Sequence, residues 1–428
     1  MQGNLITTIL ALVLYLASGL FGGNKSPSIS PDNIANLNPQ INSLPNSGTI
    51  SVSKANLRKL PSSTGEIIST LNKGTRVEIM SQKEEWYQVA ASGATIGWIS
   101  KWLINQSTPS FNNTQKIIAG YYVENYYNDP VGYKSLSQNL TTINTIIPFS
   151  FKVDQYGTIT GTHNSKPNTL TQSAGGDSLA LVNNISGGNF NSNAIHRMLS
   201  SATARSKAVN GISRLLREKG YQGVNIDFEN IPAWDRIYLT AFFKELASVL
   251  RSQNLLITAS LPAKTMDDKK SSHSGAFDYE SLAPYLDQAM IMTYDEHYTN
   301  GPAGPVASYP WVEKVIQYTK RFFPSSKIVL GLAAYGYDWG LNSGKALNYN
   351  KIQTLIAKQK VFSKWHSVYK VPYFTYKSWG ITHQVWYENS YSTASKMELV
   401  RKYGLRGVAV WRLGYEDPGI WNAIQRGF

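Results

Sequence analysis

One stretch of this chain is central to its predicted fold, Tyr221-Gln222-Gly223-Val224-Asn225-Ile226-Asp227-Phe228-Glu229-Asn230. Its apolar residues predict a buried strand, and side chains on a strand point alternately to its two faces. Asn225, Asp227 and Glu229 therefore share one face. Two carboxyls at this spacing are costly to bury unless they are paired or used. The stretch is either a solvated strand end or a site where one carboxyl controls the proton affinity of the other.

Composition narrows the possible chemistry. The 428 residues suffice for two or three domains, and the absence of cysteine excludes disulfides, thiolate zinc sites and a cysteine nucleophile. The six histidines show no HExxH-type spacing, so no metal is expected. The net charge of +14, from 41 Lys+Arg and 27 Asp+Glu, favours an anionic partner. Because the basic residues are dispersed, nucleic acid is not the expected partner.

The N-terminal region predicts export. Residues 1–23 carry no charge and contain a near-continuous apolar run from Leu5 to Phe21. This run is long for a signal peptide and slightly short for a spanning helix of about 20 residues, so a signal peptide and an uncleaved membrane anchor both stay open. Residues 24–47, rich in Ser, Pro and Asn, predict a flexible linker. The remainder is expected outside the cytoplasm.

Residues 48–106 predict a small all-β barrel, because short β-like runs alternate with Gly, Ser, Asn and Pro. The region resembles a bacterial SH3-like domain, which implies a module that binds the cell wall. The segments that carry the resemblance are Asn56-Leu57-Arg58, Pro61-Ser62, Leu71-Asn72-Lys73-Gly74, Trp86-Tyr87-Gln88-Val89 and Gly97-Trp98-Ile99.

Strand and helix patterns alternate over residues 114–428. Helical segments such as 204–219, which stops at Gly220, separate most of the strands. This order predicts an α/β fold, a (β/α)8 TIM barrel with an α+β insertion at 340–392 between strands seven and eight. The expected strands are 117–122, 143–149, 178–184, 222–228, 256–261, 288–294, 328–334 and 407–411.

The ends of these strands carry the candidate chemistry, since active sites of such barrels lie at the carboxyl ends. Strand four ends in Asp227 and Glu229, and strand six ends in a Tyr-Asp-Glu-His cluster at 294–297. Strand eight ends at Trp411. Carboxyls and aromatic rings that converge on one rim predict glycoside hydrolysis. Metal-assisted hydrolysis would need histidines beside the carboxyls, and only His297 is so placed.

Three of these segments resemble glycoside hydrolase family 18. Residues 223–230 resemble its strand-four signature, Met292-Thr293-Tyr294-Asp295-Glu296-His297 its strand-six motif, and Val408-Ala409-Val410-Trp411 its strand-eight motif. The resemblance covers roughly residues 116–428. Within the family, this region particularly resembles the spore-cortex-lytic N-acetylglucosaminidases. This resemblance implies cleavage of β-1,4 bonds after N-acetylglucosamine in cell-wall or spore-cortex peptidoglycan, without a cofactor.

The same resemblance implies a substrate-assisted retaining mechanism. Glu229 would protonate the glycosidic oxygen and later activate water. The substrate's own 2-acetamido oxygen would be the nucleophile, oriented by Asp227 and held from the opposite side by Tyr294. The further expected substrate contacts are Asp295, Trp411, Asn225, Tyr121, Tyr337, Trp386 and Glu388.

Two positions depart from the family pattern Asp-x-x-Asp-x-Asp-x-Glu. They hold Gln222 and Asn225, which leaves the pH optimum and rate open. Chitin or chitooligosaccharide hydrolysis is an alternative, and so is a non-catalytic glycan-binding protein, although the presence of Glu229 argues against the latter. A monomer that is secreted, membrane-anchored or associated with the wall or spore is expected to act on peptidoglycan or a chitin-like polymer.

Overall fold

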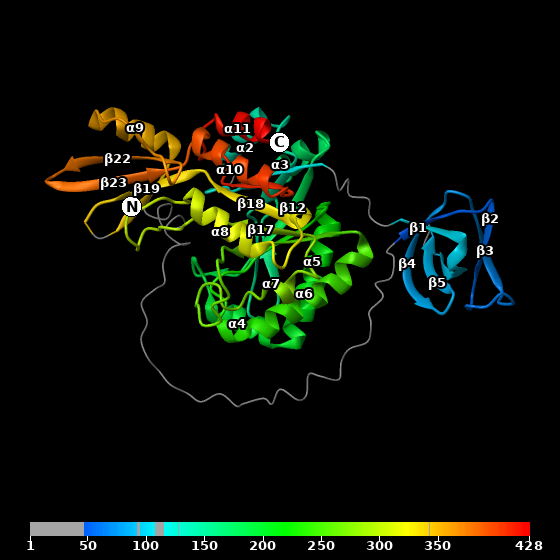
Figure 1. Ribbon diagram of the computed structural model, residues 1–428. Coiled ribbons are helices and arrows are strands. Elements are labelled where there is room, and N and C mark those ends of the chain that lie inside the picture. The colour runs from blue at the N-terminus through cyan, green and yellow to red at the C-terminus, as the bar shows by residue number, and fades with distance from the viewer. Residues whose placement is uncertain (1–46, 92–94, 108–114, 127, 342) are drawn as a thin grey trace, which may run out of the picture. The chain divides into compact units, whose positions relative to one another are not determined.

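The computed structural model describes residues 47–428 apart from 92–94, 108–114, 127 and 342 (Figure 1). The expected export segment, 1–23, and almost all of the expected linker lie outside the described residues. Within the described part of the chain, no helix has the length and apolar character needed to cross a membrane. The described residues form two compact units, a small β-domain and a larger α/β unit.

The β-domain is a seven-stranded antiparallel sheet in the order β3-β2-β6-β5-β4-β1-β7. Its strands show the alternation expected of a half-buried sheet; in β5, for example, Tyr87, Val89 and Ala91 are buried and their neighbours are not. The prediction of a small all-β domain is confirmed. The elements are β1 (Ser47–Ile50), β2 (Lys54–Arg58), β3 (Ile67–Asn72), β4 (Arg76–Lys83), β5 (Trp86–Ala91), β6 (Thr95–Ser100), η2 (Lys101–Leu103) and β7 (Ile104–Ser107).

The larger unit is built on eight parallel strands that close into a barrel. Closure is complete because β9 pairs with β8 on one side and with β12 on the other. Each strand lies within two residues of its predicted bounds, so the predicted barrel is confirmed. The strands are β8 (Ile117–Tyr122), β9 (Thr145–Pro148), β12 (Asp177–Asn183), β15 (Gly223–Asp227), β16 (Leu256–Pro262), β17 (Gln288–Met292), β18 (Ile328–Ala333) and β24 (Gly407–Trp411).

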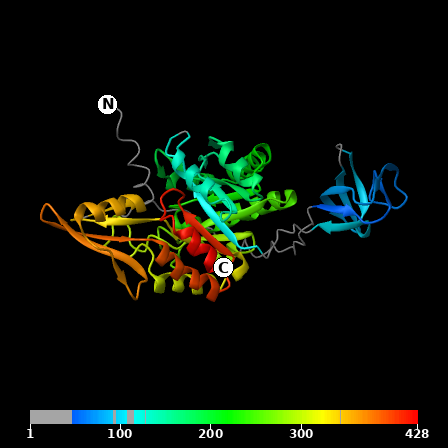
Figure 2. The ribbon, with the colours of Figure 1, turned by 90° about the horizontal axis from the view of Figure 1, so that it is seen from above.

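Helices surround the barrel, as the view from above shows (Figure 2). The helix before β15 is bounded as its sequence predicts, with a Ser201 side-chain cap at its start and Gly220 in the left-handed conformation (φ 71°) at its end. The helices are α2 (Pro130–Gln138), α3 (Ser165–Ser173), α4 (Ser192–Ser200), α5 (Ala202–Lys219), η3 (Ala233–Asp235), α6 (Arg236–Leu250), η4 (Arg251–Gln253), α7 (Tyr279–Leu282), α8 (Tyr309–Thr319), η5 (Ser325–Lys327), α10 (Ser390–Lys402) and α11 (Ile420–Gly427).

Two short hairpins follow the second and third barrel strands. After β9 the chain forms β10 (Phe151–Val153) and β11 (Ile159–Gly161), and β10 pairs in parallel with the carboxyl end of β12. After β12 it forms β13 (Ile185–Ser186) and β14 (Asn189–Phe190). Both hairpins thus stand at the end of the barrel where active sites form.

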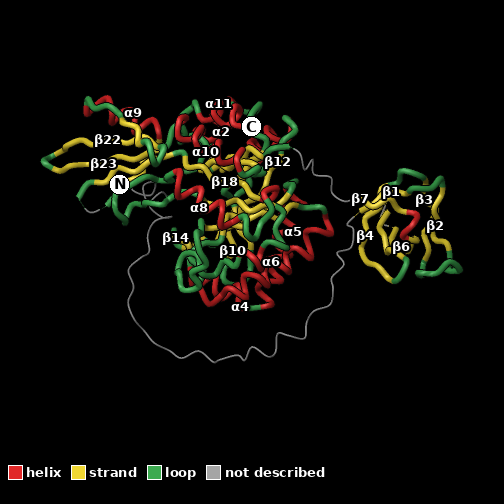
Figure 3. Tube along the Cα trace, viewed as in Figure 1, coloured by secondary structure: helices red, strands yellow, loops and turns green. Residues whose placement is uncertain are grey.

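The insertion between strands seven and eight is a separate antiparallel sheet in the order β20-β19-β23-β22-β21, flanked by a helix (Figure 3). One face packs under α9, and the other places Tyr337, Trp339 and Trp386 in one cluster with Tyr294 and Trp411 of the barrel. The predicted insertion is confirmed. Its elements are β19 (Tyr335–Trp339), β20 (Gly344–Asn348), α9 (Tyr349–Gln359), β21 (Lys364–His366), β22 (Val371–Ser378) and β23 (Ile381–Tyr387).

Candidate active site

Strand β15 divides its side chains between two cores. Val224, Ile226 and Phe228 pack between the strands and the helices. Asn225, on the other face, is fully buried; its Nδ2 donates to Thr258 Oγ1 (3.0 Å) and its Oδ1 accepts from Ser260 Oγ (2.9 Å). An amide can donate and accept at once, whereas a carboxylate only accepts and would add charge to a dry interior. This is a physical reason for asparagine at position 225.

Asp227 lies one step closer to the barrel mouth and is 5% exposed. The Ser260 hydroxyl beside it has one proton, which can go to Asn225 Oδ1 or to Asp227, while Tyr121 OH lies 2.9 Å from Ser260 Oγ and can supply a proton in turn. Burial raises the pKa of Asp227 to about 7, although the hydrogen bond from Ser260 lowers it. Asp227 can therefore carry or release a proton near neutral pH.

The backbone of Glu229 is held by the side chain of Asn184, just after β12. Glu229 N–H donates to Asn184 Oδ1, and Asn184 Nδ2 donates to the Glu229 carbonyl, each at 2.9 Å. Asn184 is 1% exposed. The sequence motifs gave Asn184 no role; its only signal was a pair of asparagines at a strand end. Because both bonds reach the main chain, Asn184 fixes the direction in which the Glu229 side chain leaves the strand.

The Glu229 carboxyl is buried without a counter-charge. Burial raises its pKa well above the usual range, and the charges of Asp227 and Asp295 raise it further. None of the ion pairs found over the described residues involves these three carboxyls. The protonated form of Glu229 is therefore favoured, which is the form that a general acid needs.

Asp295 is held by the inserted lobe. It follows β17 with a positive φ of 60°, and its Oδ1 accepts hydrogen bonds from Tyr335 OH (2.6 Å) and Tyr337 OH (2.7 Å) of β19. Burial raises the pKa of Asp295 to about 6, while the two phenols lower it. The first strand of the lobe thus fixes a carboxyl that follows the sixth barrel strand.

Tyr294 projects into the same region. Its ring meets Tyr335 edge to face (6.4 Å between centroids), and Gly331 leaves it room, because a Cβ there would lie 3.0 Å from Tyr294 Cε1. Burial is the main cause that raises the pKa of Tyr294 far above its usual value, and the neighbouring Tyr121 and carboxyls raise it further. Its hydroxyl therefore stays protonated and can donate a hydrogen bond.

The aromatic candidates occupy two positions. Trp411 lies half-buried at the end of β24, where it meets the rings of Tyr121 (5.3 Å) and Phe149 (5.6 Å) edge to face. Trp386, in the lobe, stacks on Tyr373 (4.6 Å, 15°). Its buried indole Nε1 has no hydrogen-bond partner among the described residues. A buried donor without a partner is a suitable contact for a polar ligand.

Glu388 has a different environment from the other candidates. It follows β23 and forms a buried ion pair with Lys396 of α10, 2.6 Å between Oε2 and Nζ, with both side chains 3% exposed. Burial raises the pKa of Glu388, and Lys396 lowers it. The geometry gives Glu388 a partner within the fold, and its contact with substrate stays a prediction.

Gln222 lies at the opposite end of β15 from the carboxyls. Its Oε1 accepts from Ser178 N–H (2.8 Å) and Gln172 Nε2 (3.2 Å), and its Nε2 donates to the Gly220 carbonyl (3.1 Å). The side chain thus ties the start of β15 to β12 and to helix ends. The first position of the signature has a structural role here, away from Asp227 and Glu229.

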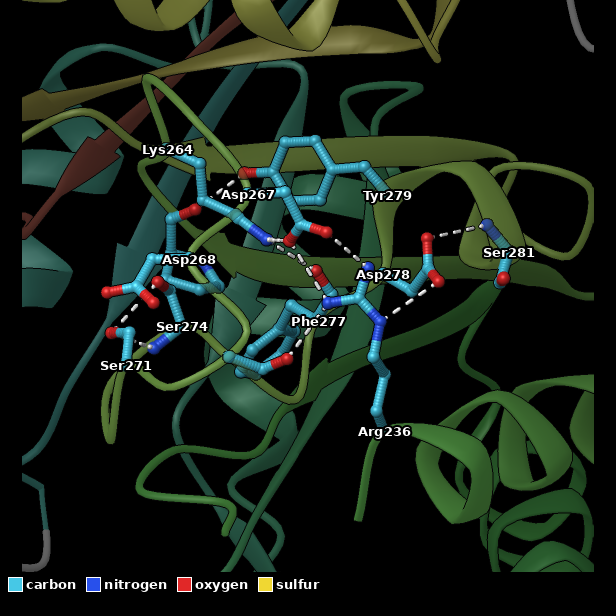
Figure 4. A network of polar contacts seen from close by, with 12 residues as sticks. Arg236, Lys264, Asp267, Asp268, Ser271, Ser274, Phe277, Asp278, Tyr279 and Ser281 are labelled. Carbon is cyan, nitrogen blue, oxygen red and sulfur yellow. Dashed lines mark hydrogen bonds and ion pairs between the residues drawn. The ribbon is translucent and has the colours of Figure 1, made fainter. Parts of the chain in front are cut away.

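A second acidic cluster follows the neighbouring strand β16 (Figure 4). Arg236 binds Asp267 (2.7 Å) and Asp278 (3.0 Å), and the buried Lys264 donates to Asp267 (2.5 Å) and to the Phe277 carbonyl (2.8 Å). Burial raises the pKa of Asp267, but the bonds and charges of Arg236 and Lys264 outweigh this and lower the pKa to about 2. This cluster, named here the Arg236 network, pins the loop between β16 and α7.

Over the described residues, no group of three or more His, Asp or Glu is placed to hold a metal ion. The groups at the barrel mouth are instead a buried carboxyl with a raised pKa, two neighbouring carboxyls and aromatic rings. At the carboxyl end of a (β/α)8 barrel, this combination defines a glycoside hydrolase.

Comparisons with known proteins specify the family. The model of glycosyl hydrolases family 18 matches residues 117–416, and the model of the bacterial SH3 domain matches residues 53–105. The chain therefore belongs to glycosyl hydrolase family 18 and carries a bacterial SH3 domain before its barrel.

Three similar proteins show the range of the family. An uncharacterized glycosylase of Bacillus subtilis, YvbX, is 31% identical over 72% of this chain and 92% of its own length. The cortical fragment-lytic enzyme of Bacillus anthracis is 28% identical over 65% of this chain and 67% of its own. The solved structure of a chitinase from Chromobacterium violaceum is 29% identical, with a TM-score of 0.68 over 73% of this chain and 99% of its own.

Proposed function

We propose that this enzyme hydrolyses the β-1,4 bond after N-acetylglucosamine in cell-wall or spore-cortex peptidoglycan, with Glu229 as the acid. The observation that carries the proposal is the burial of Glu229 beside Asp227 and Asp295 with no cation paired to it among the described residues, which raises its pKa and favours the protonated form. The similarity to a cortical fragment-lytic enzyme supports the choice of polymer. The net charge of +14 agrees with an anionic wall.

In the proposed reaction, Glu229 donates its proton to the glycosidic oxygen as the C1–O bond breaks. The oxygen of the substrate's 2-acetamido group bonds to C1 and forms an oxazolinium-type intermediate. Asp227 accepts a hydrogen bond from the acetamido N–H and balances its positive charge, while Tyr294 OH donates to the acetamido oxygen. Water then attacks C1 and passes a proton to the Glu229 carboxylate, while the bond from C1 to the acetamido oxygen breaks and restores the acetamido group, so the product keeps the starting configuration.

Other parts of the chain suit the same substrate. Trp411 supplies an aromatic floor for the sugar ring, and Trp386 offers its free indole N–H as a further contact. The SH3 domain holds the enzyme on the wall, outside the cytoplasm, whether residues 1–23 are removed or remain as an anchor.

Chitin is the second candidate substrate. The similarity to a chitinase over 99% of that protein's length favours it, and chitin presents the same N-acetylglucosamine to the assigned residues. The two substrates differ beyond this sugar, since peptidoglycan carries peptides and chitin does not.

The test compares cortex peptidoglycan and chitin as substrates for the full chain, for Glu229→Gln, and for Glu280→Gln as a control at an exposed glutamate of α7. Glu229→Gln is expected to lower kcat roughly 100-fold to 10,000-fold, since it removes the general acid. Glu280→Gln should keep full activity.

Analysis of the released reducing ends identifies the bond that is cut. A glucosamine-type end supports the proposal, and a muramic end contradicts it. Unchanged turnover in Glu229→Gln would overturn the assigned mechanism. Faster hydrolysis of chitin than of cortex would favour the second substrate.

A further inference from the structure

A groove of about 730 Å³ lies on the side of the barrel between the β10–β11 hairpin and α5. It is lined by residues 157–163 and by one face of α5 between Lys207 and Lys219. Glycines set its shape: a Cβ on Gly157 would lie 2.0 Å from the Ala204 carbonyl oxygen, and one on Gly211 would lie 3.0 Å from Ile159 Cγ1. The hairpin therefore rests directly on the helix and leaves the groove beside this contact.

The groove is positively charged. Its α5 wall contributes Lys207, Arg214 and Lys219 against one carboxylate, Glu218, and all four side chains are exposed. From Lys207 to Lys219 the helix rises about 18 Å, at 1.5 Å per residue. The cations are thus spread along the groove, an arrangement suited to an extended ligand with more than one negative charge.

Two of these cations have no polar partner among the residues that the structure describes. Arg214 and Lys219 make no hydrogen bond or ion pair with any residue that the structure describes, whereas Arg205 of the same helix binds Glu245 at 2.8 Å. Lys207 donates to Thr158 Oγ1 (2.9 Å), which directs its charge into the groove. The wall therefore offers free guanidinium and ammonium donors to a ligand.

The hairpin wall adds groups that suit a peptide. Thr160 and Thr162 expose hydroxyls, which can donate and accept hydrogen bonds. Within the described residues β11 pairs only with β10, so its outer edge is free for main-chain hydrogen bonds. An edge strand of this kind is where an extended peptide can bind.

The groove begins at the same end of the barrel as the candidate active site. Phe151 of β10, which lines the groove, is in register with Val182, two residues before the Asn184 that holds Glu229. From there α5 runs towards the start of β15, so Lys219 marks the far end of the groove. A peptide attached to a glycan at the barrel mouth can enter the groove from this end.

We propose that the groove binds an extended, carboxylate-bearing peptide, of the kind attached to the glycan of the cell wall. The cations pair with the carboxylates, and the threonines and free strand edge bond the amide groups. This inference rests on the proposed peptidoglycan substrate and adds to it a contact with the part of that substrate which chitin lacks.

Binding is measured on the full chain in the Glu229→Gln background, so that no substrate is consumed. One probe is soluble peptidoglycan fragments with their peptides, and the other is the same fragments after an amidase has removed the peptides. The test variant adds Lys207→Gln, Arg214→Gln and Lys219→Gln. We expect peptide-bearing fragments to bind about tenfold more tightly than stripped ones, because each exposed ion pair contributes roughly twofold to threefold. The triple variant should lose this preference.

The control variant removes three exposed cations outside the groove through Arg217→Gln, Lys244→Gln and Lys351→Gln, which changes the net charge equally. The control variant should keep the preference for peptide-bearing fragments. Salt well above 0.1 M should abolish this preference by screening, both in the control variant and in the Glu229→Gln protein with an intact groove.

Three outcomes would overturn the inference: no preference for peptide-bearing fragments, an equal loss in the control variant, or stronger competition by inorganic polyphosphate than by free wall peptide. Loss of the groove contact and failure of the proposed function remain distinguishable, since the first is a binding difference in an inactive background and the second is absent cleavage by the unmodified enzyme.

Discussion

Two acidic clusters lie at the same end of the barrel, after the neighbouring strands β15 and β16, and they differ in counter-charge. Among the residues that the structure describes, no cation pairs with Asp227 or Glu229, and burial raises the pKa of both. In the Arg236 network, two cations surround Asp267 and lower its pKa to about 2, although burial alone would raise it. The two clusters also differ in depth, since Asp227 and Glu229 are buried whereas the side chains of Asp267 and Asp278 are 28% and 25% exposed, so burial and partner act together. The first cluster favours the protonated form of its carboxyls, whereas the ion pairs of the second stabilise the fold.

After Glu229 itself, the comparison predicts the largest effect at Asp227. Asp227→Asn should lower kcat roughly 100-fold, because it removes the group proposed to orient the acetamido nucleophile. It should also move the alkaline limb of the kcat–pH profile to lower pH, since the charge of Asp227 is, after burial, the main factor raising the pKa of Glu229. Asp278→Asn in the Arg236 network should leave that limb in place, and an equal shift there would refute the distinction.

Arg236→Met should act on stability instead. It leaves Asp267 and Asp278 without their shared guanidinium, and at a side-chain exposure of 18% we expect a loss of about 2 kcal/mol in the free energy of unfolding. Denaturant unfolding of the full chain measures this. The pH profile of the remaining activity should be unchanged. The control Arg217→Met, at an exposed position of α5, should lie within about 0.5 kcal/mol of the original.

The two clusters should also give opposite pH dependence of stability. A raised carboxyl pKa means that the folded state binds the proton more tightly, so stability falls as pH rises above about 4.5, the unfolded value for glutamate. The stability of Glu229→Gln relative to the original should therefore be greater at pH 8 than at pH 5. Asp267, with its lowered pKa, stabilises the fold above about pH 4 and loses this contribution as pH falls through about 2.

Denaturant unfolding of Glu229→Gln and Asp267→Asn across this pH range measures the sign of each change in the free energy of unfolding. Asp267→Asn should cost stability at pH 7 and little at pH 2. A gain for Asp267→Asn at pH 7, or a lower relative stability of Glu229→Gln at pH 8 than at pH 5, would contradict the assignment of the two clusters.

The smallest effect is expected at the amino end of β15. Gln222→Met removes bonds to Ser178 and Gly220, with an expected cost of about 1 kcal/mol in the free energy of unfolding. Because these bonds lie away from the carboxyls, kcat at the pH optimum should stay within about twofold. A tenfold fall in kcat at unchanged stability would show that the first signature position acts on the chemistry after all.

The sequence predicts the barrel well because its information is local. The alternation through Val224, Ile226 and Phe228, and the glycine stop at Gly220, define each element without knowledge of its neighbours. The clustering of Asp227 and Tyr294 follows from the rule that parallel strands end on one rim.

The contacts that hold the site depend on pairs far apart in the chain. Asn184 meets Glu229 across 45 residues, and Tyr337 meets Asp295 across 42. Nothing in the local pattern around Glu388 indicates that Lys396 neutralises it. Such partners are set by tertiary packing, which motif spacing does not record.

The position of Tyr335 and Tyr337 on the first strand of the lobe bears on how this fold can be engineered. Both phenols hold Asp295, so the lobe and the barrel share one hydrogen-bonded unit although the lobe is an insertion in the chain. A design that exchanges the lobe for a shorter loop or for that of a relative must keep this pair of tyrosines. Because β20 and β23 pair directly with β19, a redesign of substrate range should begin in β21 and β22, which lie further from it in the sheet.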